Sequence, residues 1–274
     1  MKMLLKDGKA NVLTFSYDDG RHPDKRLVDI FNQYGLKGTF NISSGLYAAE
    51  GDTQNKYMPR SEAQALLKNS DHEVAVHGFK HQWPTRLTSV QLIHELLDDR
   101  QSIEDDYGTI SRGMAYAYGD YNPAVLETVR QCGIVYARTT RSTHALNFPE
   151  NWLEWHPTCH HNDPRLMEIA KRFVEEKHRH GYARLFYVWG HSFEFDRNDN
   201  WDVMEKFAQY ISGHDHIWYA TNIEIYDYVS AYNRLQVSAD EKIIHNPSAI
   251  DVWVKLDDQA YCIKAGQTIN TKAL

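Results

Sequence analysis

The sequence predicts an α/β fold: a distorted (β/α) barrel of about seven strands, similar to a TIM barrel, with a short C-terminal β appendage. Two observations carry this prediction. From about residue 10 to 235, short runs with strand composition alternate with segments of helical periodicity. After residue 235, the sequence pattern changes to alternating apolar and polar residues. A series of βα units this long fits a barrel better than a doubly wound sheet, although seven strands instead of eight make it irregular.

Seven runs have the composition of β-strands. They cover residues 12–17, 38–42, 73–76, 113–118, 134–137, 185–189 and 217–221. Because helical segments separate them, the strands are expected to lie parallel in one sheet.

The helices between these strands are expected to begin at capping residues. Ser61 precedes an apolar run, and Asn122 and Asp163 are each followed by a proline, which suits the first helical position. The apolar residues between 90 and 97 have helical spacing. The basic run 177–180 is expected to close a helix, where cations favour the dipole.

The chain divides at about residue 235. We expect residues 1–235 to form the barrel and residues 236–274 a small β-strand extension. A segment of about 40 residues cannot bury a core of its own. It is therefore expected to pack on the barrel or on a second subunit, which leaves a homo-oligomer open.

Composition narrows the class of protein. The chain has 30 Lys and Arg against 37 Asp and Glu, a net charge of −7, which disfavours a nucleic-acid partner. The three cysteines have no CxxC spacing, and charge interrupts the N-terminal apolar run after three residues. These features predict a cytoplasmic protein without a membrane segment. A chain of 274 residues needs no metal to hold its core, so any metal would serve chemistry.

Two adjacent acids end the first strand. Asp18 and Asp19, followed by Gly20, lie at the carboxyl end of that strand, where the active sites of such barrels are found. Taken alone, the pair is equally well read as an aspartate-capped turn.

Histidines follow two later strands. His77 and His81 come directly after the third strand and are four residues apart, so they would share one face of a helical turn, as two ligands of one metal require. His191 follows the sixth strand, and Tyr118 lies at the equivalent point of the fourth. One Asp and two His leave coordination positions open, which is the pattern of a catalytic site.

These motifs resemble those of the polysaccharide deacetylase (NodB-homology) family of carbohydrate esterases. The family carries a [TS][FY]DDG turn, an HxxxH pair, an RxPYG segment and a late LxLH-type histidine. They read here as residues 16–20, 77–81, 115–119 and 189–191. The resemblance implies a distorted (β/α) barrel and metal-dependent deacetylation. It also implies that Asp19, His77 and His81 are metal ligands, that Asp18 is the general base and that His191 is the general acid.

Two positions depart from the family pattern. Ala115 stands where the family has an arginine that orients the catalytic aspartate, and Gly78 replaces a Ser or Thr. Arg138 or Arg141, after the fifth strand, are candidates to supply the missing guanidinium. Asp163 is a candidate for the aspartate that tunes the acid histidine.

The residue types suit this chemistry independently of the family. A divalent ion lowers the pKa of bound water and polarises a carbonyl, Asp18 can accept a proton, and His191 can protonate a leaving amine. The backbone N–H near Tyr118 is expected to help hold the oxyanion. Imidazole and carboxylate ligands favour Zn²⁺, with Co²⁺ or Ni²⁺ as substitutes.

Other histidines and tryptophans are weaker candidates. His214 and His216 precede the seventh strand and are expected in a solvated loop at the opposite end of the barrel. His160 and His161 are equally well read as structural or as lining a substrate groove. Core packing is the better expectation for each of three tryptophans that are also candidates to stack on a sugar: Trp83, Trp155 and Trp189.

Three functions are therefore weighed. The first is a hydrolase that removes N-acetyl or O-acetyl groups from a carbohydrate or amino sugar, with a small molecule or oligosaccharide as its substrate. The second is a C–N hydrolase of the same barrel type acting on a small amide or cyclic ureide. The third is a carbohydrate-binding protein with a vestigial site. The complete set of two aspartates and three histidines argues against the third.

Overall fold

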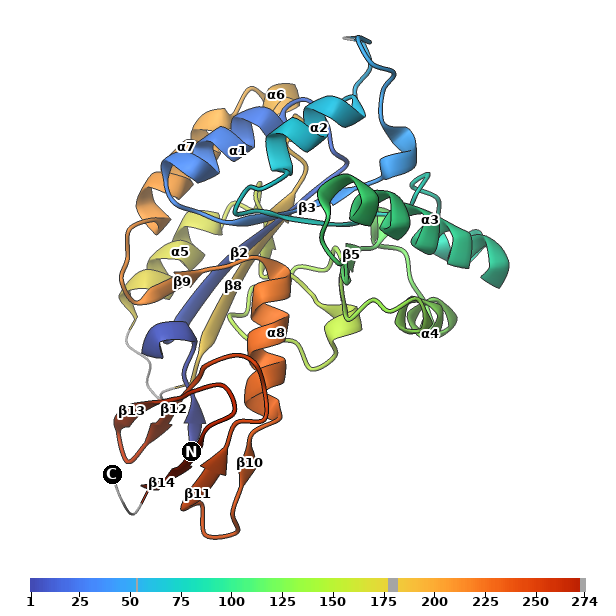
Figure 1. Ribbon diagram of the computed structural model, residues 1–274. Helices are drawn as coiled ribbons and strands as arrows, with labels where there is room; N and C mark the ends of the chain where they lie inside the picture. Colours follow the sequence, from blue (N-terminus) through green and yellow to red (C-terminus); the bar gives the residue numbers. More distant parts are fainter. Residues whose placement is uncertain (53, 177–181, 272–274) are drawn as a thin grey trace.

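A computed structural model describes residues 1–52, 54–176 and 182–271 of the chain. Its centre is a curled parallel sheet, a half-barrel, with the strand order β6-β5-β4-β3-β2-β8-β7 (Figure 1). A further strand, β9, pairs with the first residues of β2. The strands are β2 (Asn11–Asp18), β3 (Gly38–Ile42), β4 (Glu73–Val76), β5 (Gly113–Ala115), β6 (Tyr136–Arg138), β7 (Cys159–His160), β8 (Arg184–Gly190) and β9 (Ile217–Tyr219). The predicted fold class is confirmed.

Strand β2 crosses the middle of the molecule, and all of its residues are buried. Because side chains alternate between the two faces of a strand, Leu13, Phe15 and Tyr17 point to the apolar core beneath the helices. Thr14, Ser16 and Asp18 point to the other face. There Thr14 Oγ1 donates to Asn222 Oδ1 at 2.8 Å, so this face is polar and leads toward Asp18.

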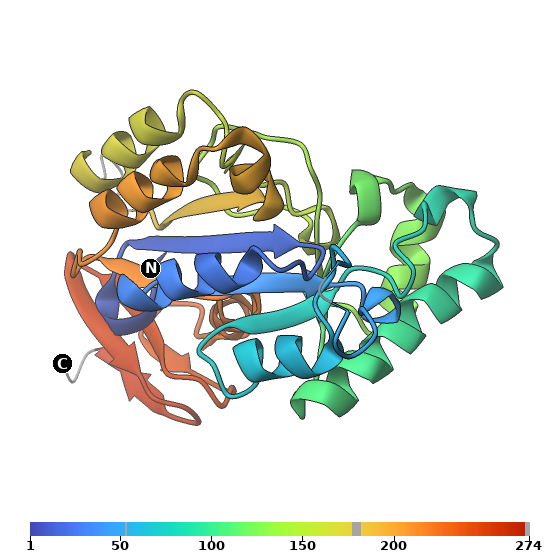
Figure 2. The same ribbon diagram turned by 90° about the horizontal axis from the view of Figure 1, so that it is seen from above.

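Eight α-helices surround the sheet within the described residues. Seen from above, α5 and α7 lie on one side of β2, and α2 and α3 lie on the other (Figure 2). The helices are α1 (Asp24–Gln33), α2 (Arg60–Leu67), α3 (Ser89–Tyr107), α4 (Pro123–Gln131), α5 (Leu166–Glu175), α6 (Phe193–Asn198), α7 (Trp201–Ile211) and α8 (Asn222–Asn233).

One of the three predicted helix starts is observed and two are wrong. Asn122 caps α4, with its side chain accepting from Val125 N at 2.9 Å. Helix α2 begins one residue before Ser61, whose hydroxyl instead donates to Glu50. Helix α5 begins at Leu166, because the Asp163 carboxylate is engaged by His144 and by the backbone of the next turn. The helix end predicted at 177–180 lies outside the described residues.

Two strand predictions also need correction. The run 113–118 is strand only to Ala115, since Tyr118 has a φ of 61°, which no strand accommodates. Strand β7 is not foreseen because it has only two residues, too few for a periodic pattern.

The C-terminal residues form two small antiparallel sheets beside the N-terminus (Figure 1). One contains β1 (Lys2–Met3), β12 (Val252–Leu256) and β13 (Gln259–Ile263), and the other contains β10 (Gln236–Val237), β11 (Ile243–His245) and β14 (Thr268–Asn270). Tyr228 on α8 joins them to the barrel, since its hydroxyl donates to Leu4 O and accepts from Trp253 N. The C-terminal extension therefore packs on the barrel of the same chain, which is one of the two partners expected for it.

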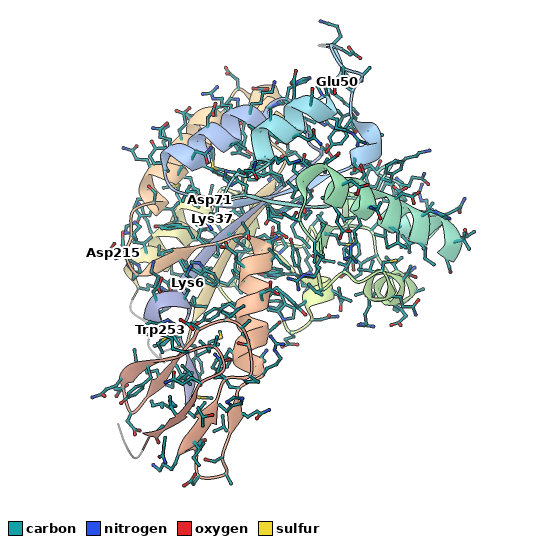
Figure 3. All side chains as sticks on the ribbon, in the orientation of Figure 1. Lys6, Lys37, Glu50, Asp71, Asp215 and Trp253 are labelled. Atoms are coloured by element: carbon teal, nitrogen blue, oxygen red, sulfur yellow. The ribbon has the colours of Figure 1, made fainter. Side chains whose placement is uncertain are left out.

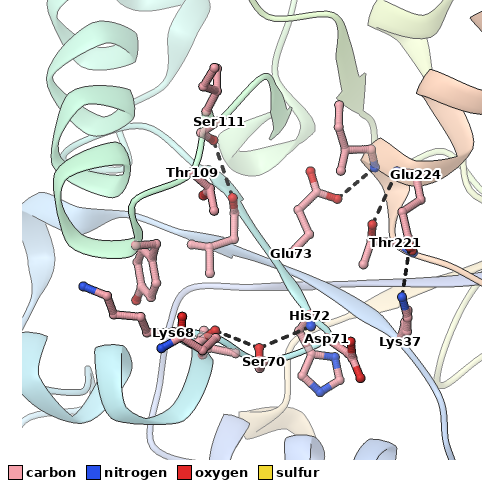
Figure 4. A pocket seen from close by; sticks show the side chains of 16 residues that line it. Lys37, Lys68, Ser70, Asp71, His72, Glu73, Thr109, Ser111, Thr221 and Glu224 are labelled. Atoms are coloured by element: carbon pink, nitrogen blue, oxygen red, sulfur yellow. Dashed lines mark hydrogen bonds and ion pairs between the residues drawn. The ribbon is translucent and has the colours of Figure 1, made fainter. Parts of the chain in front are cut away.

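A cavity of about 370 Å³ opens at the end of the sheet where β4 begins (Figure 4). Three of its charged groups are paired with each other or with the backbone. Lys37 Nζ lies 2.9 Å from Glu224 Oε1, and Glu73 accepts from Ile223 N at 2.9 Å. These contacts fasten the start of α8 to the sheet, so this cavity has a structural explanation. In Figure 3, Lys37 and Asp71 mark its position, and Asp215 lies away from it at the edge of the molecule, near β9.

Candidate active site

The C-terminal ends of the central strands surround a different cavity of about 410 Å³. All six site residues predicted from the sequence line it, although they come from four separate loops. Its walls are formed by Asp18, Asp19, Arg21, Lys56, Tyr57, His77, His81, Tyr116, Tyr118, Gly119, Thr140, Trp189, His191 and Phe193.

Asp18 ends β2 and is almost fully buried. Asn41 Nδ2, on the adjacent strand β3, donates to its Oδ1 at 2.9 Å, and the guanidinium of Arg138 binds its Oδ2. Burial alone would raise the pKa of this carboxyl, but Arg138 and the neighbouring imidazoles of His77 and His191 outweigh burial and lower the pKa. Asp18 is therefore held as a carboxylate at neutral pH.

Arg138 takes the place of the guanidinium that Ala115 lacks. It is fully buried on β6, and its guanidinium lies over the ring of Trp189 at 4.4 Å. Strands β5 and β6 are neighbours, and Ala115 pairs with Arg138 in register. The guanidinium charge is therefore supplied by the neighbouring strand, at the position along the sheet where Ala115 lies. Arg141, the other candidate, is exposed.

Asp19, His77 and His81 form a compact three-residue group. His77 Nε2 and His81 Nε2 are 3.1 Å apart, and they lie 3.8 Å and 3.6 Å from Asp19 Oδ1. Two ligands about 2.1 Å from a tetrahedral ion are about 3.4 Å apart, so these three atoms are spaced like ligands around one ion. The other oxygen of Asp19 binds Arg21 at 2.7 Å.

The surrounding protein orients His77 for this role. His77 Nδ1 lies 2.9 Å from the carbonyl oxygen of Ala115, to which it donates, and this leaves the Nε2 lone pair facing the cluster. The His77 backbone N–H donates to the buried carboxyl of Asp99 at 2.9 Å. Burial, reinforced by the adjacent His77, lowers the pKa of His81 to about 4, so at neutral pH its ring is uncharged. The donor set and its orientation fit a divalent metal ion.

Three residues of this cavity have a strained backbone conformation. Asp19, His81 and Tyr118 have φ angles of 89°, 53° and 61°, a region that residues other than glycine rarely adopt. Such conformations persist where the surrounding structure over-determines them, and they cluster at functional sites.

His191 lies beside Asp18 in the wall of the cavity. It follows Gly190 at the end of β8, and its Nε2 lies 3.8 Å from Asp18 Oδ2. Burial alone would lower the pKa of this imidazole, but the carboxylates of Glu194, Asp18 and Asp19 together raise the pKa. The ring is thus inclined to carry a proton.

Glu194, rather than Asp163, is the acidic residue behind His191. Glu194 Oε1 lies 3.6 Å from His191 Nδ1, whereas Asp163 binds His144 Nε2 at 2.6 Å. Sequence reasoning missed Glu194. The available signal was its position three residues after His191, because α6 begins at Phe193 and brings such a pair together.

An aromatic pair borders the cavity. Tyr118 is half exposed and stacks on Trp83 with ring centroids 4.0 Å apart and planes inclined by 4°. Trp83 is therefore not a core residue, contrary to the expectation. Trp155 is fully buried, and Trp189 is buried against Arg138, as expected for core packing.

Two further predictions concern other histidines. His214 lies in the loop before β9, away from this cavity, with Nε2 2.9 Å from Tyr210 O. His160 and His161 lie behind His191, where both face Glu194.

The fold is that of (β/α) barrels whose functional cavity lies at the C-terminal ends of the strands. Residues 6–137 match the family model described as polysaccharide deacetylase. The family resemblance expected from the motifs is thereby confirmed for this region of the chain.

Individual proteins agree with this assignment. Chitin deacetylase 1 of Cryptococcus neoformans is 27% identical over 151 residues, which are 53% of this chain and 29% of that protein. The chain thus spans less than a third of this curated relative.

Two solved structures share the fold. PuuE allantoinase superposes with a TM-score of 0.60 and 13% identity, covering 81% of this chain and 90% of that one. A family 4 carbohydrate esterase from Streptomyces lividans, in complex with acetate, superposes with a TM-score of 0.50 and 18% identity. The match covers 76% of this chain and 90% of that one. Within the described residues, none of the helices has the length and apolar character needed to cross a membrane.

Proposed function

We propose that this chain is a metal-dependent deacetylase that hydrolyses N-acetyl or O-acetyl groups of a carbohydrate or amino sugar. One observation carries the proposal: Asp18 and His191 lie 3.8 Å apart in a cavity whose wall also holds the Asp19, His77 and His81 cluster. The family of residues 6–137 supports the same conclusion.

Asp19, His77 and His81 would hold the ion, for which Zn²⁺ is the best candidate, with Co²⁺ or Ni²⁺ as substitutes. When bound, such an ion polarises the acyl carbonyl and lowers the pKa of the attacking water.

Asp18 and His191 divide the proton transfers between them. Asp18, kept ionised by Arg138, accepts a proton from the attacking water, because it adjoins the ligand group without belonging to it. His191 donates a proton to the departing nitrogen. The backbone N–H near Tyr118 would stabilise the charge that develops on the carbonyl oxygen.

The rim of the cavity suits a sugar. Trp83 and Tyr118 offer a flat aromatic platform, and Arg21, Lys56 and Tyr57 supply polar groups in the same cavity. Aromatic faces pack against the apolar face of a pyranose ring, while polar neighbours bind its hydroxyls.

A substrate panel tests the proposal. Protein stripped of metal and reloaded with Zn²⁺ or Co²⁺ is incubated with N-acetylated and O-acetylated sugars and with cyclic ureides. Release of acetate, dependent on the metal, is expected. Ring opening of a cyclic ureide without acetate release would instead assign the C–N hydrolase function. Sugar binding without turnover of any substrate would assign a carbohydrate-binding protein.

The two aspartates provide matched variants. Asp18→Asn should abolish turnover and leave metal content intact, whereas Asp19→Asn should lose both. Metal loss in Asp18→Asn would show that Asp18 is a ligand.

A cytoplasmic location and self-association through the 236–274 extension stay predictions. Cell fractionation tests the location, and size-exclusion chromatography tests the self-association.

A further inference from the structure

A second group of metal-type donors lies behind His191 and has no part in the proposed reaction. It consists of His160 on β7, His161 directly after it, and Glu194 on α6. Within the described residues, only this group and the Asp19, His77 and His81 cluster bring three such donor atoms within 4.8 Å of one another.

The spacing of this second group matches a coordination shell. His160 Nε2 and His161 Nε2 lie 3.0 Å and 3.2 Å from the same atom, Glu194 Oε2. Ligands of a tetrahedral Zn²⁺ at 2.0–2.2 Å are separated by about 3.3–3.6 Å, so the donors need only move apart by a few tenths of an ångström to surround an ion.

Two of the three donor atoms lack a hydrogen bond within the described part of the chain. His161 is fully buried, and neither its Nε2 nor Glu194 Oε2 has a hydrogen-bond partner there. Leaving buried polar atoms unpaired is unfavourable. Because both atoms belong to a group of three metal-type donors within 4.8 Å of one another, they indicate a missing partner that accepts lone pairs, which is a cation.

The rings and the carboxylate are held in position by groups that leave these atoms free. The His161 ring is stacked between Tyr17 and Phe195 at centroid distances of 5.6 Å and 4.1 Å. Glu194 Oε1 is occupied by Arg197 at 3.2 Å, so Oε2 is left for the histidines. An ion can reach this group from the surface, because the side chain of His160 is 24% exposed.

One contact changes when an ion binds. The Asn162 backbone N–H donates to His160 Nδ1 at 3.2 Å, which places the ring proton on Nε2. Ligation through Nε2 moves that proton to Nδ1 and breaks this bond. Asn162 is exposed, so its N–H can turn to water instead.

We propose that His160 Nε2, His161 Nε2 and Glu194 Oε2 form a second divalent-cation site, suited to Zn²⁺ or Co²⁺, separate from the Asp19, His77 and His81 cluster. It adjoins the active site through a single side chain, since His191 lies 3.8 Å from Asp18 on one side and 3.6 Å from Glu194 on the other. The proposal concerns ion binding and does not depend on the deacetylase function.

Ion counting tests the proposal on the full chain. Chelator-stripped protein is dialysed against Zn²⁺ and analysed for metal, and titrated with Co²⁺ while visible absorption is followed. The wild type should bind two ions and His77→Ala/His81→Ala should bind one. His160→Asn should also bind one, and the triple variant none.

Two further variants make the result specific. Glu194→Gln keeps the size of the side chain and should also lose one ion, which covers the case in which His160→Asn misfolds; circular dichroism and thermal unfolding verify each fold. His144→Asn is the matched control, because His144 also faces a carboxylate, Asp163 at 2.6 Å, but belongs to no three-donor group. It should keep both ions.

Several results would overturn the second site. These are a wild type that binds one ion, a His77→Ala/His81→Ala variant that binds none, or two ions retained in both His160→Asn and Glu194→Gln. Because ions are counted without reference to turnover, a failure of the deacetylase assay would leave this test intact.

Discussion

At the scale of single residues, Arg138 and Glu194 determine the electrostatics of the cavity. Arg138 binds Asp18 and keeps it ionised, while Glu194 faces His191 and favours its charged form. A carboxylate without its proton and an imidazole inclined to carry one are thereby held side by side in the cavity, which is the pair of groups that the proposed hydrolysis of an amide needs.

Replacing Arg138 tests its link to Asp18. Arg138→Gln removes the charge that lowers the pKa of Asp18, so that pKa should rise and the acidic limb of the kcat/KM profile should move to higher pH. Turnover at neutral pH should fall by about a hundredfold or more. Arg141→Gln, on an exposed residue of the following loop, is the control and should change neither quantity. An unshifted acidic limb in Arg138→Gln would remove Arg138 from this role.

His191 is tested by comparing two leaving groups. An amine must be protonated as it departs, whereas an alkoxide leaves more readily, so His191→Ala should slow N-acetyl substrates by about a hundredfold to ten-thousandfold and O-acetyl esters distinctly less. Turnover by the wild type should fall at high pH as the imidazolium deprotonates. Equal loss on both substrate classes, with metal content retained, would indicate substrate binding instead of proton donation.

At the scale of elements, two loops at the cavity rim depend on each other. The loop after β4 carries Trp83, the loop after β5 carries Tyr118, and the two rings stack. Tyr118 adopts a left-handed backbone conformation in the loop that follows the end of β5 at Ala115. Neither loop forms the platform alone.

Removing half of this platform should weaken substrate binding without slowing the chemical step. A stacked aromatic contact contributes about 0.5–1.5 kcal/mol, so Trp83→Ala should raise KM for an oligosaccharide about two- to tenfold and leave kcat nearly unchanged. Ile110→Ala, an exposed apolar residue that does not line the cavity, serves as the control in the same steady-state assay. A kcat that falls while KM is constant would argue against the platform.

At the scale of the whole molecule, stability depends on carboxyl groups buried far from the reaction. Burial raises the pKa of Glu73 to about 7, although Tyr136, Ile223 and Thr39 donate to it. The folded protein therefore binds this proton between about pH 4.5 and 7 while the unfolded chain releases it. Consequently, the free energy of unfolding contributed by Glu73 is highest below this window and falls as pH rises through it.

A neutral substitute removes this dependence. In Glu73→Gln, the decline of the free energy of unfolding between pH 5 and 7 should become shallower by up to about 1.4 kcal/mol per pH unit. Urea titrations of chelated protein at pH 5, 6 and 7 measure the slope. Glu127→Gln is the control, because Glu127 forms an exposed ion pair with Arg130 on α4, and it should leave the slope unchanged. An identical slope in Glu73→Gln would mean that Glu73 is ionised in the folded protein.

Local patterns in the sequence determined the half-barrel fold and the residues that its strand ends bring together. The alternation in residues 11–18 places Asp18 on the inner face, and the rule that parallel strands deliver their C-terminal loops to one edge brings His77, His81 and His191 to the same cavity. Only the tertiary structure decided which charged groups accompany them. Arg138 reaches Asp18 across 120 positions in the chain, and Glu194 meets His160 and His161 from another strand end. Such pairings have no local period, because they arise from which strands become neighbours and at what register they pair.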